Sequence, residues 1–382
     1  MNKKITLIAV VLVTVFLGWY FWPSGQGGSL PTYFSYSEEE LSLLRSLSSP
    51  KVMSPKDIYS GDEQLFDLVS RGTTVSGFDP NTSKIYAYLA MAERDAAHIS
   101  FNLKGKFAGS LGPIYKETLC IFFKDDCATI SASGDTYSEE LAKIVLAKVR
   151  LRMAEDENVL KPYPSKTGKE YWNGPEPRIG IADGSAKTWF IKTGSQFRAA
   201  PPPAFGSDEF KEQLALTKKA LSEATDEQKK AVVFWAGGPG TPTPPGIWLK
   251  IADDYMRQNN IELDKVLSAR ALLAMAISDA VVAVFDSKYT YWTRRPFMQD
   301  SSIITIMPTP NHPSYPAGHS TLSAAAEAVL SHFFPETEKD WKAEAEEGGM
   351  SRVWGGIHYP MDHDAGILLG GNVAREAISK FK

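Results

Sequence analysis

Apolar residues recur at helical spacing along much of the chain. Between Ser83 and Phe101, four of them fall on one stripe: Ile85, Leu89, Ala92 and Ala96. This three- and four-residue spacing predicts an amphipathic helix. A second amphipathic run extends from Glu139 to Glu155. A third helix is expected to begin at Ser207 and to run towards Lys219, because a serine followed by two acidic residues is typical of an N-cap and a first helical turn.

From about Leu263 onward the predicted helices are more strongly apolar. They extend from Val266 to Phe285, from Ser320 to Phe334 and from His358 to Phe381. None shows the alternation expected of strands. Alanines in the first of them allow close helix packing: Ala271, Ala274, Ala276, Ala280 and Ala283. The sequence therefore predicts an all-α protein, a helical bundle.

Residues 161–208 interrupt the helical pattern, because they are rich in glycine and proline. We interpret them as an ordered loop or a connector between two halves. The predicted organisation has an N-terminal helical region at 30–205 and a C-terminal domain at 206–382. The length of 382 residues also allows one large domain.

The chain begins with Lys3 and Lys4, followed by an uncharged apolar run from Ile5 to Trp22. This run is nearly long enough to span a bilayer as a helix, and a Gly/Ser-rich tether follows it. We favour an uncleaved signal anchor with its tether at 1–29; a cleaved signal peptide is the alternative. In both cases the rest of the chain is exported. It would sit on the periplasmic face of the inner membrane, touching the membrane only through this helix, or be secreted if cleaved.

Charge and cysteine content narrow the classes of function. The net charge is -4, and no basic stripe is present, which argues against nucleic acid as a partner. The two cysteines, Cys120 and Cys127, lie seven residues apart. In an exported chain the simplest interpretation is a local disulfide, with two buried thiols as the alternative.

Three short motifs near the C-terminus carry the candidate chemistry, the first being Lys288-x6-Arg295-Pro296. If the helix continues through this motif, both cations project from one face, because they are two turns apart. Pro296 then ends or bends the helix. An ordinary solvated charge pair is the alternative, but the aromatic neighbours Tyr289 and Trp292 favour an enclosed site.

The second motif, Pro316-Ala317-Gly318-His319, leads into an alanine-rich helix. A helix N-terminus offers unpaired amides and a positive dipole end, and Gly318 permits close approach of an anion. A capping loop whose histidine bonds a carbonyl is the alternative.

The third motif is Ser351-Arg352-x5-His358-x3-Asp362. His358 and Asp362 share a helix face if the final helix begins near Ile357, so the carboxylate can hold one ring nitrogen. A structural His-Asp contact is the alternative. Together the three motifs bring three cations, two imidazoles and a carboxylate, a set that suits a tetrahedral oxyanion such as phosphate or vanadate.

At these motifs the chain resembles the superfamily that unites type 2 phosphatidic acid phosphatases (PAP2), bacterial class A acid phosphatases and vanadium-dependent haloperoxidases. The signature is K-x6-RP, PSGH and SR-x5-H-x3-D, and every position matches except Ala317, which stands in place of a serine. Further stretches are similar to exported bacterial haloperoxidase-like proteins, among them Phe197-Arg198-x2-Pro201-Pro202-Pro203 and Asp286-x-Lys288-Tyr289. The run that begins at His312 is similar to bromoperoxidases.

The resemblance implies a PAP2/haloperoxidase-type helical bundle with its catalytic domain at 206–382. It implies that His358 binds vanadium axially, or attacks phosphorus in a phosphatase, and that Asp362 orients it. His319 would be the acid-base group, and His312 would belong to the halide or substrate pocket. The remaining motif residues would hold the vanadate or phosphate oxygens: Lys288, Arg295, Gly318 and Arg352.

The expected function is therefore a vanadium-dependent haloperoxidase that oxidises bromide or iodide with hydrogen peroxide. Because vanadate resembles the transition state of phosphoryl transfer, an exported acid phosphatase acting on a small phosphate monoester through a phosphohistidine is the alternative. A non-catalytic anion-binding or surface interaction protein is a third possibility, which the intact cations and histidines disfavour.

Overall fold

The computed structural model describes residues 29–72 and 80–382. The membrane-spanning or signal helix predicted at Ile5 to Trp22 lies outside the described residues. Within them every regular element is a helix, and the only β-type pairings are two isolated bridges, Val52 with Ala108 and Tyr171 with Thr293. The all-α prediction is therefore confirmed for the described part of the chain.

The helices fall into an N-terminal and a C-terminal series, joined by irregular chain. The first series is α1 (Glu38–Ser46), α2 (Pro55–Gly72), α3 (Pro80–Lys104), α4 (Gly112–Phe122), η1 (Cys127–Thr129) and α5 (Thr136–Val159). The connector contains only the short η2 (Asp183–Ser185). The second series is α6 (Asp208–Ser222), α7 (Asp226–Phe234), α8 (Thr243–Gln258), α9 (Leu263–Tyr291), α10 (Pro296–Gln299), α11 (Gly318–Phe333), η3 (Pro335–Thr337), α12 (Glu338–Trp354) and α13 (Pro360–Lys380).

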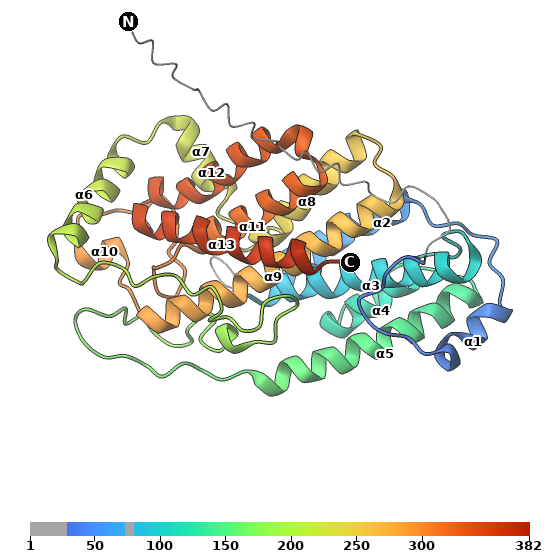
Figure 1. The fold of residues 1–382 in the computed structure, drawn as a ribbon. Coiled ribbons are helices and arrows are strands. Elements are labelled where there is room, and N and C mark those ends of the chain that lie inside the picture. Colours follow the sequence, from blue (N-terminus) through green and yellow to red (C-terminus); the bar gives the residue numbers. More distant parts are fainter. Residues whose placement is uncertain (1–28, 73–79) are drawn as a thin grey trace, which may run out of the picture.

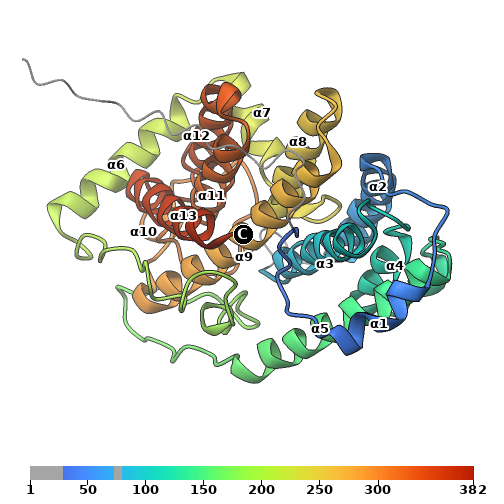
Figure 2. The same cartoon turned by 45° about the vertical axis from the view of Figure 1, so that its right-hand side comes forward.

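Helix α9 is the centre of the molecule. It lies between α3 on one side and α11 and α13 on the other, as both ribbon views show (Figures 1 and 2). Almost its whole length is buried. Both series of helices contribute side chains to the same hydrophobic core around α9, from Leu44 in α1 to Ala377 in α13.

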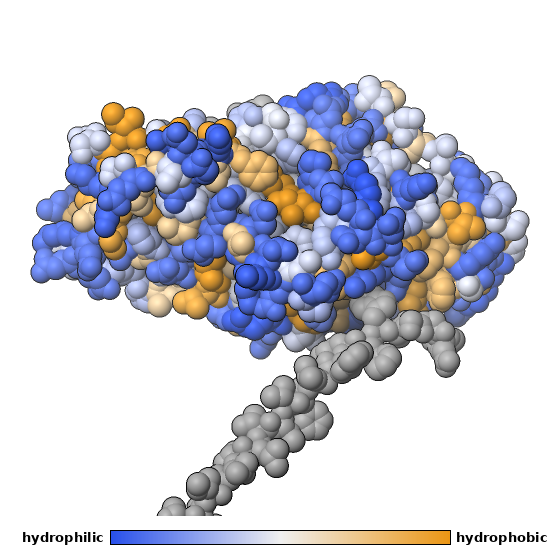
Figure 3. All heavy atoms as spheres, turned by 90° about the horizontal axis from the view of Figure 1, so that it is seen from above, coloured by the Kyte–Doolittle hydropathy of each residue, from blue (hydrophilic) through white to orange (hydrophobic). Residues whose placement is uncertain are grey.

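One helix in the described region, α9, is long and apolar enough to cross a membrane, and its apolar window is entirely buried inside the protein. Its apolarity is accounted for by its place in the core. The face seen in Figure 3 is mostly hydrophilic, with separate hydrophobic patches.

Two glycines allow α13 to approach the first turns of α11. A Cβ atom on Gly366 would lie 2.8 Å from the Ala317 carbonyl oxygen, and one on Gly370 would lie 2.0 Å from the Thr321 carbonyl oxygen. Larger side chains at these positions would push the two helices apart. This close approach places the start of α13 beside the N-terminus of α11, where two of the three motifs meet.

Several local predictions are confirmed. The predicted helices at 83–101, 139–155 and 266–285 form the central parts of α3, α5 and α9, and the helix predicted at Ser320 to Phe334 corresponds to α11. Ser207 caps α6 by accepting a hydrogen bond from the amide of Phe210. Cys120 and Cys127 form a disulfide that joins the end of α4 to η1.

Two helix boundaries differ from the predictions. The helix that carries Lys288 does not continue to Arg295, because it ends at Tyr291 and Trp292 adopts a left-handed conformation with φ of 57°. Arg295 is extended and precedes α10, as expected for a residue before proline. The last helix begins at Pro360 rather than at His358, because Tyr359 is extended and proline takes the first helical position.

Candidate oxyanion-binding site

The three motifs converge at the C-terminal end of α9, the segment 300–317 and the adjoining ends of α11, α12 and α13. Their charged and imidazole side chains are nearly inaccessible: Lys288, Arg295, His312, His319, Arg352, His358 and Asp362 are all buried. Lys288 and Arg295 reach the site from different elements, so the prediction that one helix face presents both is wrong. The left-handed turn at Trp292 redirects the chain so that the two cations still come together.

Lys288 is held by three backbone carbonyls. Its Nζ atom donates to the carbonyl oxygens of Pro313, Ser314 and Pro316, at 2.9, 2.7 and 2.6 Å. Burial, followed by the nearby charge of Arg295, lowers the pKa of Lys288 well below its usual value. The ammonium group therefore fixes the segment that leads into the second motif and adds positive charge to the site.

Arg295 contacts the motif histidine His358 and also His312. Its Nη1 atom lies 2.8 Å from Nε2 of His358 and donates to the carbonyl of Ile357 at 2.9 Å, while Nη2 lies 3.1 Å from Nδ1 of His312. Since guanidinium groups only donate, Nε2 of His358 accepts in this arrangement. Burial lowers the pKa of Arg295 to about 10.

Arg352 extends from the last turn of α12. Its Nε donates to the Ser351 hydroxyl at 3.0 Å, Nη2 donates to the Val232 carbonyl at 2.5 Å, and Nη1 lies 2.7 Å from the sulfur of Met307. Burial lowers the pKa of Arg352 to about 9.

His358 is oriented by Asp362. The Nδ1 atom of His358 lies 2.7 Å from Oδ2 of Asp362, and the same oxygen accepts from the Ser314 hydroxyl at 2.5 Å and the Tyr359 amide at 3.2 Å. Burial raises the pKa of Asp362 to about 6, although these hydrogen bonds oppose the shift. Burial and the neighbouring cations lower the pKa of His358 well below its usual value. The ring is therefore neutral, with its hydrogen on Nδ1 and its lone pair on Nε2 directed towards Arg295.

His319 lies in the first turn of α11 and is bonded to the end of α7. Its Nε2 atom is 2.7 Å from the Trp235 carbonyl, and since a carbonyl only accepts, Nε2 carries the hydrogen. Burial and the charge of Arg352 lower its pKa well below the usual value. The C-terminal turn of α7 thus supplies acceptors both to His319, through Trp235, and to Arg352, through Val232.

His312 packs edge-on against Phe285, with ring centroids 5.4 Å apart. Nδ1 faces both Nη2 of Arg295, a donor at 3.1 Å, and the Pro313 carbonyl, an acceptor at 3.0 Å. Nε2 is buried and has no hydrogen-bond partner among the described residues. The structure thus places His312 beside Arg295.

Gly318 begins α11 and leaves open room beside it. A Cβ atom built on Gly318 would meet no heavy atom within 4 Å, although the residue is buried. The first amides of a 16-residue helix are available there, and Ala317 makes no side-chain cap. Among the described residues of the site, three cations are opposed by the single carboxylate of Asp362. A bound oxyanion would offset this excess of buried positive charge, so the residues fit vanadate or phosphate.

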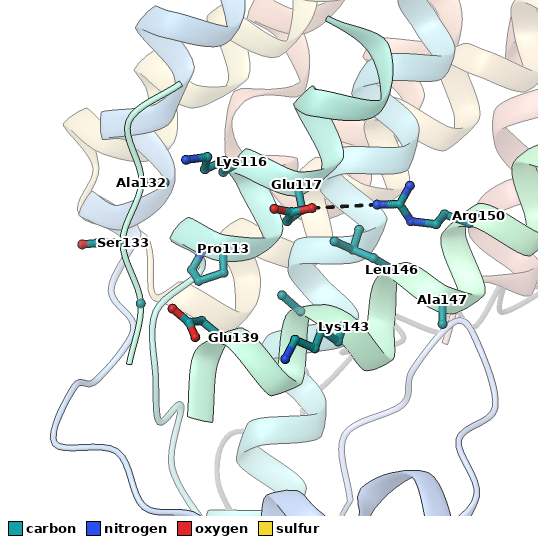
Figure 4. A pocket seen from close by; sticks show the side chains of 12 residues that line it. Pro113, Lys116, Glu117, Ala132, Ser133, Glu139, Lys143, Leu146, Ala147 and Arg150 are labelled. Atoms are coloured by element: carbon teal, nitrogen blue, oxygen red, sulfur yellow. Dashed lines mark ion pairs between the residues drawn. The ribbon is translucent and has the colours of Figure 1, made fainter. Parts of the chain in front are cut away.

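A surface pocket of about 660 Å³ lies between α4 and α5, and none of the predicted site residues lines it (Figure 4). Its rim mixes Lys116, Lys143 and Arg150 with Glu117 and Glu139, and Glu117 pairs with Arg150 at 3.8 Å. Because positive and negative side chains lie side by side here, the pocket lacks the net positive charge of the oxyanion site.

Sequence reasoning missed several groups that support the site. Ser314 stands between His312 and the second motif, and its closeness to both is the signal that would have identified it. The carbonyls of Val232 and Trp235 carry no side-chain signal at all. Met307 lies outside every motif, so only the fold brings it to Arg352.

Comparisons of the sequence with known proteins find similarity in its C-terminal part. Residues 268–381 match the PAP2 superfamily. A curated relative, the bacitracin transport permease protein BcrC of Bacillus licheniformis, is 25% identical over 107 residues, which are 28% of this chain and 52% of that protein. The match thus spans about half the length of this relative.

Solved structures resemble a larger share of the chain. A bacterial vanadium-dependent iodoperoxidase matches with a TM-score of 0.69 and 19% identity, covering 88% of this chain and 98% of that one. An apo-type bacterial vanadium-dependent chloroperoxidase matches with a TM-score of 0.54 and 12% identity, covering 89% and 98%. The PAP2 match is thus confined to residues 268–381. The structural match covers 88% of the chain and shows the all-α fold of the bacterial vanadium iodoperoxidase.

Proposed function

We propose that this protein is a vanadium-dependent haloperoxidase that oxidises bromide or iodide with hydrogen peroxide at a vanadate bound by His358. The observation that carries the proposal is the arrangement of His358: a neutral ring held by Asp362, with a buried lone pair facing the cations. The similarity to haloperoxidase structures includes the N-terminal helices as well as the PAP2 region, which supports a peroxidase over a phosphatase.

Each side chain then has a defined task. Vanadate, when bound, supplies a Lewis-acidic centre that activates peroxide. Nε2 of His358, which now faces Nη1 of Arg295, would hold the vanadate, and the Arg295 guanidinium group would donate to its oxygens. Arg352 and the Gly318 amide would donate hydrogen bonds to the oxygens of the anion in a site closed to water. Lys288 would add positive charge from the other side of the segment 313–316, whose carbonyls it binds.

His319 is proposed as the acid-base group. In the described structure Nε2–H is donated to the Trp235 carbonyl, so Nδ1 carries the lone pair of the neutral ring. Because its pKa is lowered, the ring is neutral and can act as a base, which suits removal of a proton from incoming peroxide. His312, beside Arg295 and Phe285, is proposed to border the halide or organic substrate.

An exported acid phosphatase is the second candidate, because the same cations and histidines suit phosphoryl transfer. In that case His358 attacks phosphorus, and His319 gives a proton to the leaving alcohol of a small monoester. Ala317 does not separate the two candidates, since it removes a hydroxyl that the signature of the whole superfamily carries.

We also propose that the protein is exported, on the periplasmic face of the inner membrane or secreted if the N-terminal segment is cleaved. The Cys120–Cys127 disulfide supports an oxidising compartment. Membrane contact is assigned to the N-terminal segment only, and nucleic acid is not expected as a partner.

The test is an assay of the purified full chain in detergent. Bromide and iodide oxidation by hydrogen peroxide is measured with and without orthovanadate, beside hydrolysis of p-nitrophenyl phosphate. The proposal expects halide oxidation that depends on added vanadate. If vanadate only inhibits hydrolysis and never supports halide oxidation, the phosphatase is the correct assignment.

The variant His358→Ala should abolish whichever activity is found, whereas His332→Ala, an exposed histidine of α11, serves as the matched control. Retained activity in the His358 variant would contradict both proposed mechanisms.

A further inference from the structure

Met307 contacts one of the site cations although no motif contains it. Its sulfur lies 2.7 Å from Nη1 of Arg352, and only 8% of the residue is exposed. It packs with Val232 and Ile357, which border the same region. A thioether is therefore placed where an oxyanion oxygen would be expected to meet the guanidinium group.

The three cations differ in how firmly their hydrogens are held. Lys288 donates to three carbonyls, and Arg295 donates to carbonyls and an imidazole nitrogen. Among the described residues, the acceptor that faces Nη1 of Arg352 is a thioether sulfur, which is a weak one. Nη1 is thus the donor that an incoming oxyanion captures at the lowest cost.

We propose that Met307 is an oxidation site that controls anion binding through Arg352. The sulfur lone pair attacks one oxygen of hydrogen peroxide, an S–O bond forms and the O–O bond breaks. The second oxygen leaves as water after taking up the proton of the first. Sulfur is oxidised by two electrons and peroxide is reduced.

The sulfoxide oxygen is a strong acceptor, unlike the thioether. It pairs with Nη1 of Arg352 and keeps that donor from the oxyanion. Excess peroxide would therefore reduce the affinity of the site for its anion. A methionine sulfoxide reductase would restore it. This inference rests on the proposed function only in that an oxyanion is the ligand.

The experiment treats the full-length protein with reagent hydrogen peroxide for graded times. Oxygen addition at each methionine is measured by peptide mass spectrometry, and affinity for inorganic phosphate and for orthovanadate by isothermal titration calorimetry. We expect affinity to fall about tenfold in parallel with oxidation of Met307. Sulfoxide reductase should restore it. Met361, 9% exposed, is the exposure-matched methionine, and its oxidation should not track the loss.

Two variants isolate the sulfur. Met307→Leu keeps similar volume and removes the weak acceptor, so phosphate should bind about twofold tighter and peroxide should no longer weaken binding. Met307→Gln places a strong acceptor beside Arg352 and should weaken binding without any oxidant. Met361→Leu is the control, and it should remain as sensitive to peroxide as the native protein.

The proposal is overturned if Met307 is fully oxidised and affinity is unchanged, or if the Met307→Leu protein loses affinity as readily as the native one. Phosphate binding without vanadate-dependent halide oxidation would overturn the proposed peroxidase function alone, since this test uses reagent peroxide. If neither anion binds the untreated protein, both proposals fail.

Discussion

The hydroxyl of Ser314 donates a hydrogen bond of 2.5 Å to Oδ2 of Asp362, the same oxygen that faces His358. This hydrogen bond stabilises the ionised carboxylate and opposes the burial that raises its pKa to about 6. Ser314 is thus a positioning residue: its shorter hydrogen bond acts on His358 through Asp362, and its hydroxyl also lies 3.3 Å from Nδ1 of His358 itself.

Ser314→Ala should move the acid limb of the activity profile to higher pH. Loss of one hydrogen bond to a buried carboxylate raises the pKa of Asp362, by roughly one unit. Protonated Asp362 no longer accepts from Nδ1 of His358, so activity should be several-fold lower near pH 6 and close to normal at pH 8. The pH dependence of kcat/KM measures this, with Ser314→Thr as the control that retains the hydroxyl. Superimposable profiles for the alanine and native proteins would refute the assignment.

Gly318→Ala should reduce anion binding without harming the fold. The added methyl group meets no protein atom within 4 Å, so it occupies the open room beside the start of α11. Affinity for phosphate or vanadate should fall about tenfold, as for other insertions into a fitted space. The free energy of unfolding should stay the same or rise by up to about 1 kcal/mol, because alanine favours helix.

The matched control is Gly371→Ala, a helical glycine of α13 whose added Cβ would meet only the flexible end of Arg375. Calorimetric titration and chemical denaturation measure the two quantities. Unchanged affinity in the Gly318 variant would show that the oxyanion does not approach this helix end.

Ala317→Ser should strengthen anion binding. It restores a hydroxyl at the N-cap of α11, next to Gly318, where one extra hydrogen bond contributes about 1 kcal/mol, or about fivefold in affinity. The same change supplies a side-chain cap that the helix lacks. Weaker vanadate binding in this variant would indicate that the hydroxyl turns to the helix amides instead of the ligand.

Glu93→Gln should change how stability depends on pH. Glu93 is buried near Arg270 and Asp62, and burial raises its pKa to about 7 from 4.5. Between these values the folded protein binds more protons than the unfolded chain, so the free energy of unfolding falls as pH rises, by about 3 kcal/mol from this group.

Glutamine resembles the protonated acid, so the variant should match the native protein near pH 4.5 and exceed its stability near pH 8. Denaturant unfolding across this pH range provides the measurement, with the exposed Glu39→Gln as the charge-matched control. A constant difference between native and variant protein at all pH values would contradict the prediction.

The sequence was most informative where a structural role, such as a helix cap or a disulfide, depends on residues close together in the chain. Ser207 and the closely spaced cysteines act within a few residues, so their structural roles could be predicted. The helix α12 was not predicted, because Gly348 and Gly349 and a polar surface obscure its pattern. The path from Lys288 to Arg295 was predicted wrongly, since the left-handed turn at Trp292 is fixed by packing from the connector rather than by local preference.

In the candidate site, too, local features could be predicted from the sequence and long-range contacts could not. Side chains that make up the motifs could be assigned to one pocket from their order in the chain. The backbone acceptors that hold Lys288, His319 and Arg352, and the sulfur of Met307, depend on segments far away in the sequence. Such contacts leave no trace in spacing or composition.

The end of α7 offers a place from which the site can be observed. Val233 is 66% exposed, while the carbonyls of its neighbours Val232 and Trp235 are bonded to Arg352 and His319. A fluorophore or spin label attached at position 233 would lie in solvent and leave the pocket intact. If a bound ligand moves Arg352 or His319, the last turn of α7 should move with it and the signal of the label should change. The rate of ligand binding could then be measured without any catalytic turnover.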